Sequence, residues 1–123
     1  MKTATFTIEP FSESFNRFKR TFEAVQAGRN VEPQEVVGFT SLEAARNFLT
    51  RERLALLRAI KTRHPTSIYA LAKMVDRDLK NVQDDIRILE RHGLVKITKR
   101  PRGSRKVKVP EVPFEEIALR IAI

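Results

Sequence analysis

Hydrophobic and polar positions alternate over residues 3–8, with apolar side chains on one side and threonines on the other. A period of two predicts a half-buried strand. From Ser12 the apolar spacing changes to three and four residues, which predicts a helix that Ser12 caps and Gly28 ends. Such a stripe is more typical of a core or a dimer interface than of a ligand site; its members are Phe11, Phe15, Phe18, Phe22 and Val25.

A second strand and helix follow in the first half of the chain. Residues 29–34, which include Pro33, read as a loop, and residues 35–40 as a short strand. Ser41 can cap the next helix, whose apolar side holds Leu42, Ala45, Phe48 and Leu49. We therefore expect residues 1–49 to form an N-terminal extension that enlarges the core and holds a second copy of the chain.

Residues 50–63 show a further helical pattern, which Thr50 can cap and Pro65 closes. Its predicted buried side is Leu54, Leu57 and Ile60, with Leu56 flanking.

Residues 67–93 contain two helical patterns separated by a short polar break. Ser67 can cap the first, whose buried stripe is Ile68, Leu71, Ala72 and Val75. Asp76 suits the left-handed turn, and Asp78 can cap the second helix. That helix ends at Gly93 and buries Leu79, Val82, Ile86 and Leu89.

The remaining residues predict strands. Residues 94–98 and 105–109 alternate and flank a turn over 99–104, which makes a β-hairpin with a basic tip. Pro110 and Pro113 are expected to break the chain. Residues 117–123 alternate as a C-terminal strand, although a helix remains an alternative, and the N-terminal strand is its possible partner within one chain or across a dimer.

The net charge of +9 is confined to one part of the sequence. Residues 1–49 hold six Lys/Arg and six Asp/Glu, whereas residues 50–123 hold eighteen and nine. A one-sided basic field favours a polyanionic partner, and a solvated basic surface is the alternative.

Several functional classes are disfavoured. The chain has no cysteine for disulfides, thiol chemistry or cysteine-ligated zinc. No apolar run follows the first residues, and none is long enough to span a bilayer, so we expect a cytoplasmic protein. His64 and His92 stand at helix ends, and Asp84 and Asp85 point about 100° apart on a helix. We therefore expect no enzymatic activity, cofactor or metal site.

Two helices, a third polar-faced helix and a basic hairpin follow the order of a winged helix, whose third helix enters the major groove of duplex DNA. Asn81 could read adenine and Arg87 guanine, while Lys80 could contact phosphate, as could Gln83 at the flank. Asp84 could pair with Lys80, which we favour, or accept from cytosine. The predicted contacts from the helices are Ser67, Lys80, Asn81, Gln83, Asp84, Arg87 and Arg91.

The hairpin is the stronger electrostatic signal, because residues 96–108 hold seven Lys/Arg and no acid. It could follow the DNA backbone, with an arginine entering the minor groove. A solvated hairpin that protects an exposed edge is the alternative. The predicted wing contacts are Lys99, Arg100, Arg102, Arg105 and Lys106.

Residues 50–109 resemble a MarR-type winged-helix DNA-binding domain through LTRERLALLRAI and SIYALAKMVDRDLKNVQDDIRILERHGLV. They are similar to a subgroup of small predicted regulators of bacteria and archaea, some of which are regarded as antitoxin-like partners of RelE-type toxins. The resemblance implies base contacts by Asn81 and Arg87. It also implies wing contacts by Arg100, Arg102 and Arg105. The sequence departs from the pattern at Asp76, where glycine is common, and at Asp84, on a face that is usually basic or neutral.

The prediction is an α+β fold: a winged helix-turn-helix over residues 50–109, an N-terminal strand-helix-strand extension over 1–49 and a C-terminal strand in 110–123. The predicted function is that of a sequence-specific, homodimeric repressor of transcription that binds double-stranded DNA through recognition helix 79–92 and wing 96–108. The alternative is an antitoxin that binds a RelE-type toxin and autoregulates its operon.

Overall fold

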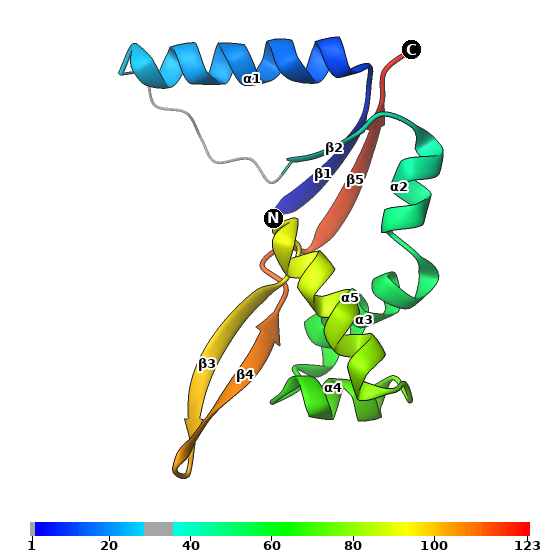
Figure 1. Cartoon of the computed structure of the whole chain (residues 1–123), viewed down its shortest axis with the longest axis vertical. Coiled ribbons are helices and arrows are strands. Elements are labelled where there is room, and N and C mark those ends of the chain that lie inside the picture. The colour runs from blue at the N-terminus through cyan, green and yellow to red at the C-terminus, as the bar shows by residue number, and fades with distance from the viewer. Residues whose placement is uncertain (1, 29–35) are drawn as a thin grey trace. The chain divides into compact units, whose positions relative to one another are not determined.

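The computed structural model describes residues 2–28 and 36–123 (Figure 1). They form two compact units. The sheet unit comprises the described residues of Thr3–Phe48 together with Glu116–Ile123. The winged-helix unit comprises Lys2 and Leu49–Glu115.

The sheet unit contains a parallel sheet in the order β2-β1-β5. The C-terminal strand thus pairs with the N-terminal strand of the same chain, with Thr3 opposite Glu116 and Ile8 opposite Ile121. The elements of this unit are β1 (Thr3–Ile8), α1 (Phe11–Gln26), β2 (Val36–Phe39), α2 (Leu42–Phe48) and β5 (Glu116–Ile121).

An aromatic cluster forms the core of the sheet unit. Phe6 of β1 is 2% exposed, and its ring centroid lies 5.4 Å from that of Phe39 and 5.8 Å from that of Phe48. Because Phe48 belongs to α2, this cluster fixes α2 on the face of the sheet that carries Ala4, Phe6 and Ile8. The alternation of residues 3–8 therefore predicted this strand and its buried face correctly.

Helix α1 begins at Phe11, two residues earlier than a cap at Ser12 predicts. Pro10 occupies the N-cap position with φ −57° and makes no side-chain cap, so Ser12 lies inside the helix and the predicted cap is wrong. Proline fixes φ near the helical value, which lets the chain enter the helix directly. The helix ends before Gly28, which has φ +73° as predicted for a stop. The predicted loop 29–34 lies outside the described residues.

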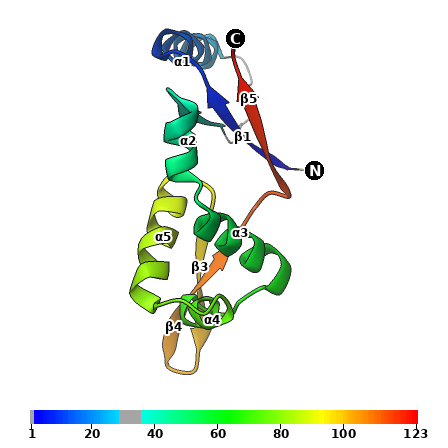
Figure 2. The ribbon, with the colours of Figure 1, turned by 90° about the vertical axis from the view of Figure 1, so that its right-hand side faces the viewer.

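The winged-helix prediction is confirmed. Helices α3 (Arg51–Arg63), α4 (Ile68–Met74) and α5 (Leu79–Arg91) precede an antiparallel hairpin of β3 (Lys96–Arg102) and β4 (Arg105–Glu111), seen from the side in Figure 2.

The predicted caps of these helices are also confirmed. The side chains of Thr50, Ser67 and Asp78 accept from backbone N–H groups at 3.2, 2.9 and 3.4 Å. Asp76 has φ +54°, the left-handed conformation expected for the turn.

The hairpin is longer and its turn is shorter than predicted. The pairing of Arg102 with Arg105 leaves only two residues in the turn, and β4 continues through Pro110, which was expected to break it. A two-stranded hairpin has an unpaired outer edge along each strand. Proline, which lacks an N–H, is accommodated at such an edge.

The buried side of α3 also differs from the prediction. Leu56 is fully buried and Leu54 only half-buried. Helix α3 contacts both α4 and β4, so a wider part of its surface is covered than one stripe.

Candidate nucleic-acid interface

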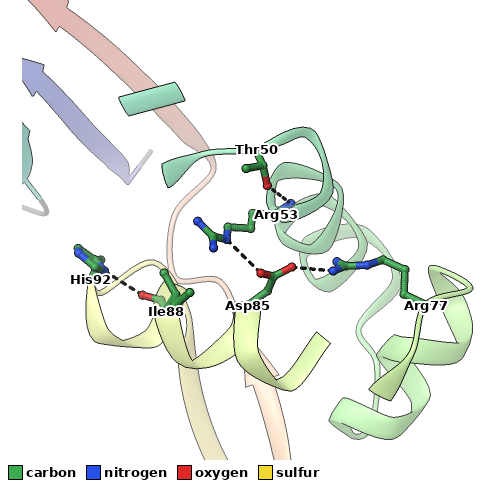
Figure 3. A network of polar contacts seen from close by, with 6 residues as sticks. All are labelled: Thr50, Arg53, Arg77, Asp85, Ile88 and His92. Carbon is green, nitrogen blue, oxygen red and sulfur yellow. Dashed lines mark hydrogen bonds and ion pairs between the residues drawn. The ribbon is translucent and has the colours of Figure 1, made fainter. Parts of the chain in front are cut away.

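Asp85 fixes α5, the predicted recognition helix, to the rest of the winged-helix unit (Figure 3). Its Oδ1 accepts from Arg53 Nε of α3 at 3.1 Å, and its Oδ2 accepts from Arg77 Nη2 in the preceding turn at 2.8 Å. The Asp85 side chain is 15% exposed, so the pairs are largely shielded from water. One carboxylate therefore joins α3, the turn and α5, and sets the direction in which α5 presents its outer face.

Sequence reasoning missed this role of Asp85. The available signal was its position, because Asp85 lies beside the apolar stripe that contains Val82 and Ile86. A carboxylate at the edge of a buried stripe requires a cationic partner.

The outer face of α5 carries most of the predicted reading residues. Gln83 lies at its half-buried margin, and the exposed residues are Lys80, Asn81, Asp84, Arg87 and Arg91. Asp84 pairs with Arg87 at 3.3 Å instead of with Lys80, so the favoured pairing is wrong. Residues three apart face each other on a helix as well as residues four apart, and the guanidinium offers more donors than the ammonium.

Ser67 is placed differently from the other predicted contacts. It is 7% exposed, and its hydroxyl accepts from the Ala70 N–H, so its visible role is to cap α4.

The register of the hairpin sorts its cations onto two faces. Directly paired residues share a face, and successive residues alternate between faces. One face, which we call the lysine face, carries Lys99 opposite Lys108 and Pro101 opposite Lys106.

The other face, which we call the arginine face, carries Arg100 opposite Val107 and Arg102 opposite Arg105.

The lysine face lies on the side of the recognition helix. Lys99 and Lys108 line a groove of about 380 Å³ together with Gln83 and Arg87 of α5. This groove therefore brings two wing cations and three polar side chains of α5, one of them the acidic Glu90, to one surface. Lys108 was not among the predicted contacts, because the predicted six-residue turn concealed its pairing with Lys99.

The arginine face is directed elsewhere. Arg100 and Arg102 line a separate groove of about 670 Å³ with Ile60 and His64 at the end of α3. Arg100 is also paired with Glu111 at 3.0 Å. The structure thus separates the arginines predicted for the minor groove from the surface that α5 shares with the lysine face.

The two histidines stand at helix ends. His92 Nδ1 lies 2.9 Å from the carbonyl oxygen of Ile88, and His64 is the left-handed C-cap of α3. Within the described ranges, no group of three His, Cys, Asp or Glu side chains could hold a metal ion. No described helix is long and apolar enough to cross a membrane.

Glu115 shows the one resolved titration shift in the described part of the chain. Its carboxylate accepts from the Lys2 backbone N–H at 2.7 Å, and this bond is the main cause that lowers the pKa of Glu115. Desolvation opposes it, and the nearby Lys61 ammonium lowers the pKa further. The shift concerns an exposed group that lies outside α5 and the hairpin.

The chain was compared with known proteins. No curated protein matches it. A solved structure described as a possible transcriptional regulator from Methanosarcina mazei Go1 is similar at 18% identity and a TM-score of 0.46. That match covers 60% of this chain and 66% of that one, just under two thirds.

A transcriptional regulator homologue protein from Pyrococcus horikoshii OT3 is similar at 26% identity and a TM-score of 0.43. That match covers 58% of this chain and 76% of the other.

A family model supplies the assignment. The HVO_A0114 model matches residues 48–119, which include every element of the winged-helix unit and are more than half of the chain. The protein belongs to the HVO_A0114 family.

Proposed function

We propose that this protein is a sequence-specific, homodimeric regulator of transcription, a repressor, that binds double-stranded DNA. The observation that carries the proposal is the shared surface of α5 and the lysine face of the wing, where Lys99 and Lys108 stand beside Gln83 and Arg87. Duplex DNA presents base edges in a groove that admits one helix and phosphates on either side of it. This surface matches both features.

The roles divide between the helix and the wing. Asn81 is exposed near the start of α5, where an amide can bond two atoms of an adenine edge. The lysines of the wing are point charges without a base preference, so they suit phosphates. Specificity then comes mainly from α5, and a large part of the affinity comes from the wing.

The first experiment measures binding of the full chain to the duplex upstream of its own gene by fluorescence anisotropy between 50 and 200 mM salt. Each neutralised phosphate contributes about −0.9 to the slope of log K against log salt. Lys80, Lys99, Lys106 and Lys108 give an expected slope of roughly −3 to −4 per subunit. Equal affinity for a scrambled duplex, or no salt dependence, would refute sequence-specific binding through this surface.

An antitoxin that binds a RelE-type toxin is the second candidate. The exposed aromatic side chains of α1, such as Phe18 at 68% and Phe22 at 53%, are the observation that favours it. Co-expression with the product of the adjacent gene and purification of a stoichiometric complex tests this function. Such a complex should dissociate when Phe18 is replaced by Asp.

A further inference from the structure

Helix α1 carries an exposed aromatic face, which we define as Phe15, Phe18, Phe22 and Val25. These four side chains are 53–68% exposed. The rings of Phe18 and Phe22 stack at a centroid distance of 6.4 Å, so the face is continuous rather than scattered. A contiguous apolar surface of this kind marks an interaction site.

The sheet of the same chain explains why α1 does not bury this face on it. A helix that connects two parallel strands ordinarily packs on the sheet. The other face of β1 carries Thr3, Thr5 and Thr7, of which Thr7 is buried at 4% exposed. The strand pairing adds Val36, Gly38, Ala118 and Arg120 to this face. Val36 and Ala118 are its apolar members beside the threonines, the glycine and Arg120, so this face offers α1 less apolar contact than the opposite face does.

The opposite, apolar face of the sheet is only partly covered. Phe6 and Ile8 of β1 are 2% and 8% exposed beneath α2. Their partners in β5, Leu119 and Ile121, share that face but are 53% and 54% exposed. We call Leu119 and Ile121 the apolar strip of β5.

We propose that a second copy of this chain covers both surfaces, with α1 of each subunit packing its aromatic face on the apolar strip of β5 in the other. The contact is made twice about a two-fold axis, as in the commonest class of oligomer. The inference rests on the homodimer of the proposed function and names the surface that forms it.

The area favours this reciprocal arrangement over a simple helix pair. A half-exposed phenylalanine offers roughly 100 Å², so two aromatic faces alone bury about 800 Å², the scale of a crystal contact. Adding the apolar strip on both subunits raises the total to about 1,200 Å², the lower limit for a specific interface.

Charge also favours a second copy. The first 49 residues carry six Lys/Arg and six Asp/Glu, so two such regions meet without net repulsion. The positive excess lies in residues 50–123, where it is available to DNA.

The test is sedimentation equilibrium of the full chain without DNA. The wild type is expected at twice the 14.2 kDa chain mass. Phe18→Asp and Leu119→Lys should each raise the dissociation constant roughly 100-fold, because each dimer then holds two charges against apolar surface. The matched control is Asn16→Asp, which adds the same charge on the other side of α1 and should leave the dimer intact. Circular dichroism confirms that each variant is folded.

Mixing the two variants identifies the contact. A heterodimer of Phe18→Asp with Leu119→Lys has one native contact and one in which the aspartate faces the lysine, whereas each homodimer has two damaged contacts. Mixing should therefore restore the dimer mass. If Leu119→Lys stays dimeric alone, the helices pair with each other and the proposal is wrong; a monomeric wild type also overturns it and leaves the aromatic face to a different protein.

The same samples separate this inference from the proposed function. A wild-type dimer that fails to bind DNA refutes the proposed regulator function but supports the proposed dimer interface. A wild-type monomer that binds its upstream duplex refutes the proposed dimer interface but supports the proposed DNA binding.

Discussion

Replacing Asp85 by Ala tests the claim that one carboxylate holds the recognition helix in place. The change removes two charge-assisted hydrogen bonds, at 3.1 Å to Arg53 and 2.8 Å to Arg77. Such bonds contribute about 1.5–3 kcal/mol each. The three side chains are 15–25% exposed, so water partly compensates and the lower value applies. We expect the free energy of unfolding to fall by about 3 kcal/mol.

Urea unfolding followed by the fluorescence of Tyr69 measures this change. Tyr69 is the single tyrosine, the chain has no tryptophan, and α4 belongs to the winged-helix unit, so the signal reports that unit. With a denaturant slope of about 1.5 kcal/mol per molar urea, the midpoint should fall by roughly 2 M.

The matched control is Asp84→Ala at the neighbouring helix position. Both changes gain the same helix propensity, so the difference between them isolates the network. The Asp84 side chain is 51% exposed and its pair with Arg87 is a surface pair, worth at most about 0.5 kcal/mol. The reasoning fails if Asp85→Ala and Asp84→Ala differ by less than about 1 kcal/mol.

Three further predictions concern DNA binding, measured by anisotropy. Lys99→Ala with Lys108→Ala should weaken binding to every duplex and reduce the salt slope by about 2, whereas Arg100→Ala should change the slope by less than about 0.5, because Arg100 lies on the other face and pairs with Glu111. An equal loss from both changes would show that the face of the wing does not matter. Asn81→Ala should lower the preference for the cognate duplex by about 5- to 100-fold with an unchanged salt slope, and a loss shared by scrambled duplexes would contradict base reading. Asp84→Ala should raise affinity roughly 3-fold, since it frees Arg87 and removes a negative charge facing the phosphates; weaker binding would instead indicate that Asp84 accepts from a base.

Local features of the fold were predictable because they depend on neighbouring residues. The side-chain caps of Thr50, Ser67 and Asp78 follow from residue type and position. The alternating pattern of residues 3–8 gave the strand and its buried face. The C-terminal strand also follows from its period, but its pairing with β1 in the same chain is a long-range contact that no local pattern encodes.

The candidate site was less predictable because it depends on register. The basic composition of residues 96–108 indicated a polyanion-binding hairpin, but the pairing of strands decides which cations share a face. Pro101 and the following Gly103 favoured a long turn, whereas the strands continue to Arg102. Because of this difference in register, Lys99 and Lys108 lie beside α5, whereas the arginines of the wing were expected to make the groove contacts.

In a helix that is proposed to face DNA, the adjacent carboxylates of Asp84 and Asp85 look equally unfavourable in the sequence, but their surroundings in the structure give them opposite effects. Asp85 points into the unit between two guanidinium groups, so its charge is more than neutralised and it contributes order rather than repulsion. Asp84 remains on the outer face, where Arg87 alone balances it. Because Arg87 is also a candidate reader, its contact with a base competes with its contact with Asp84. If Arg87 reads a base as proposed, the pair with Asp84 lowers the affinity for every DNA sequence. A base that offers Arg87 two acceptors then recovers more of that loss than a base that offers none. In the proposed DNA complex, Asp84 would thereby raise the selectivity of α5 and lower its affinity.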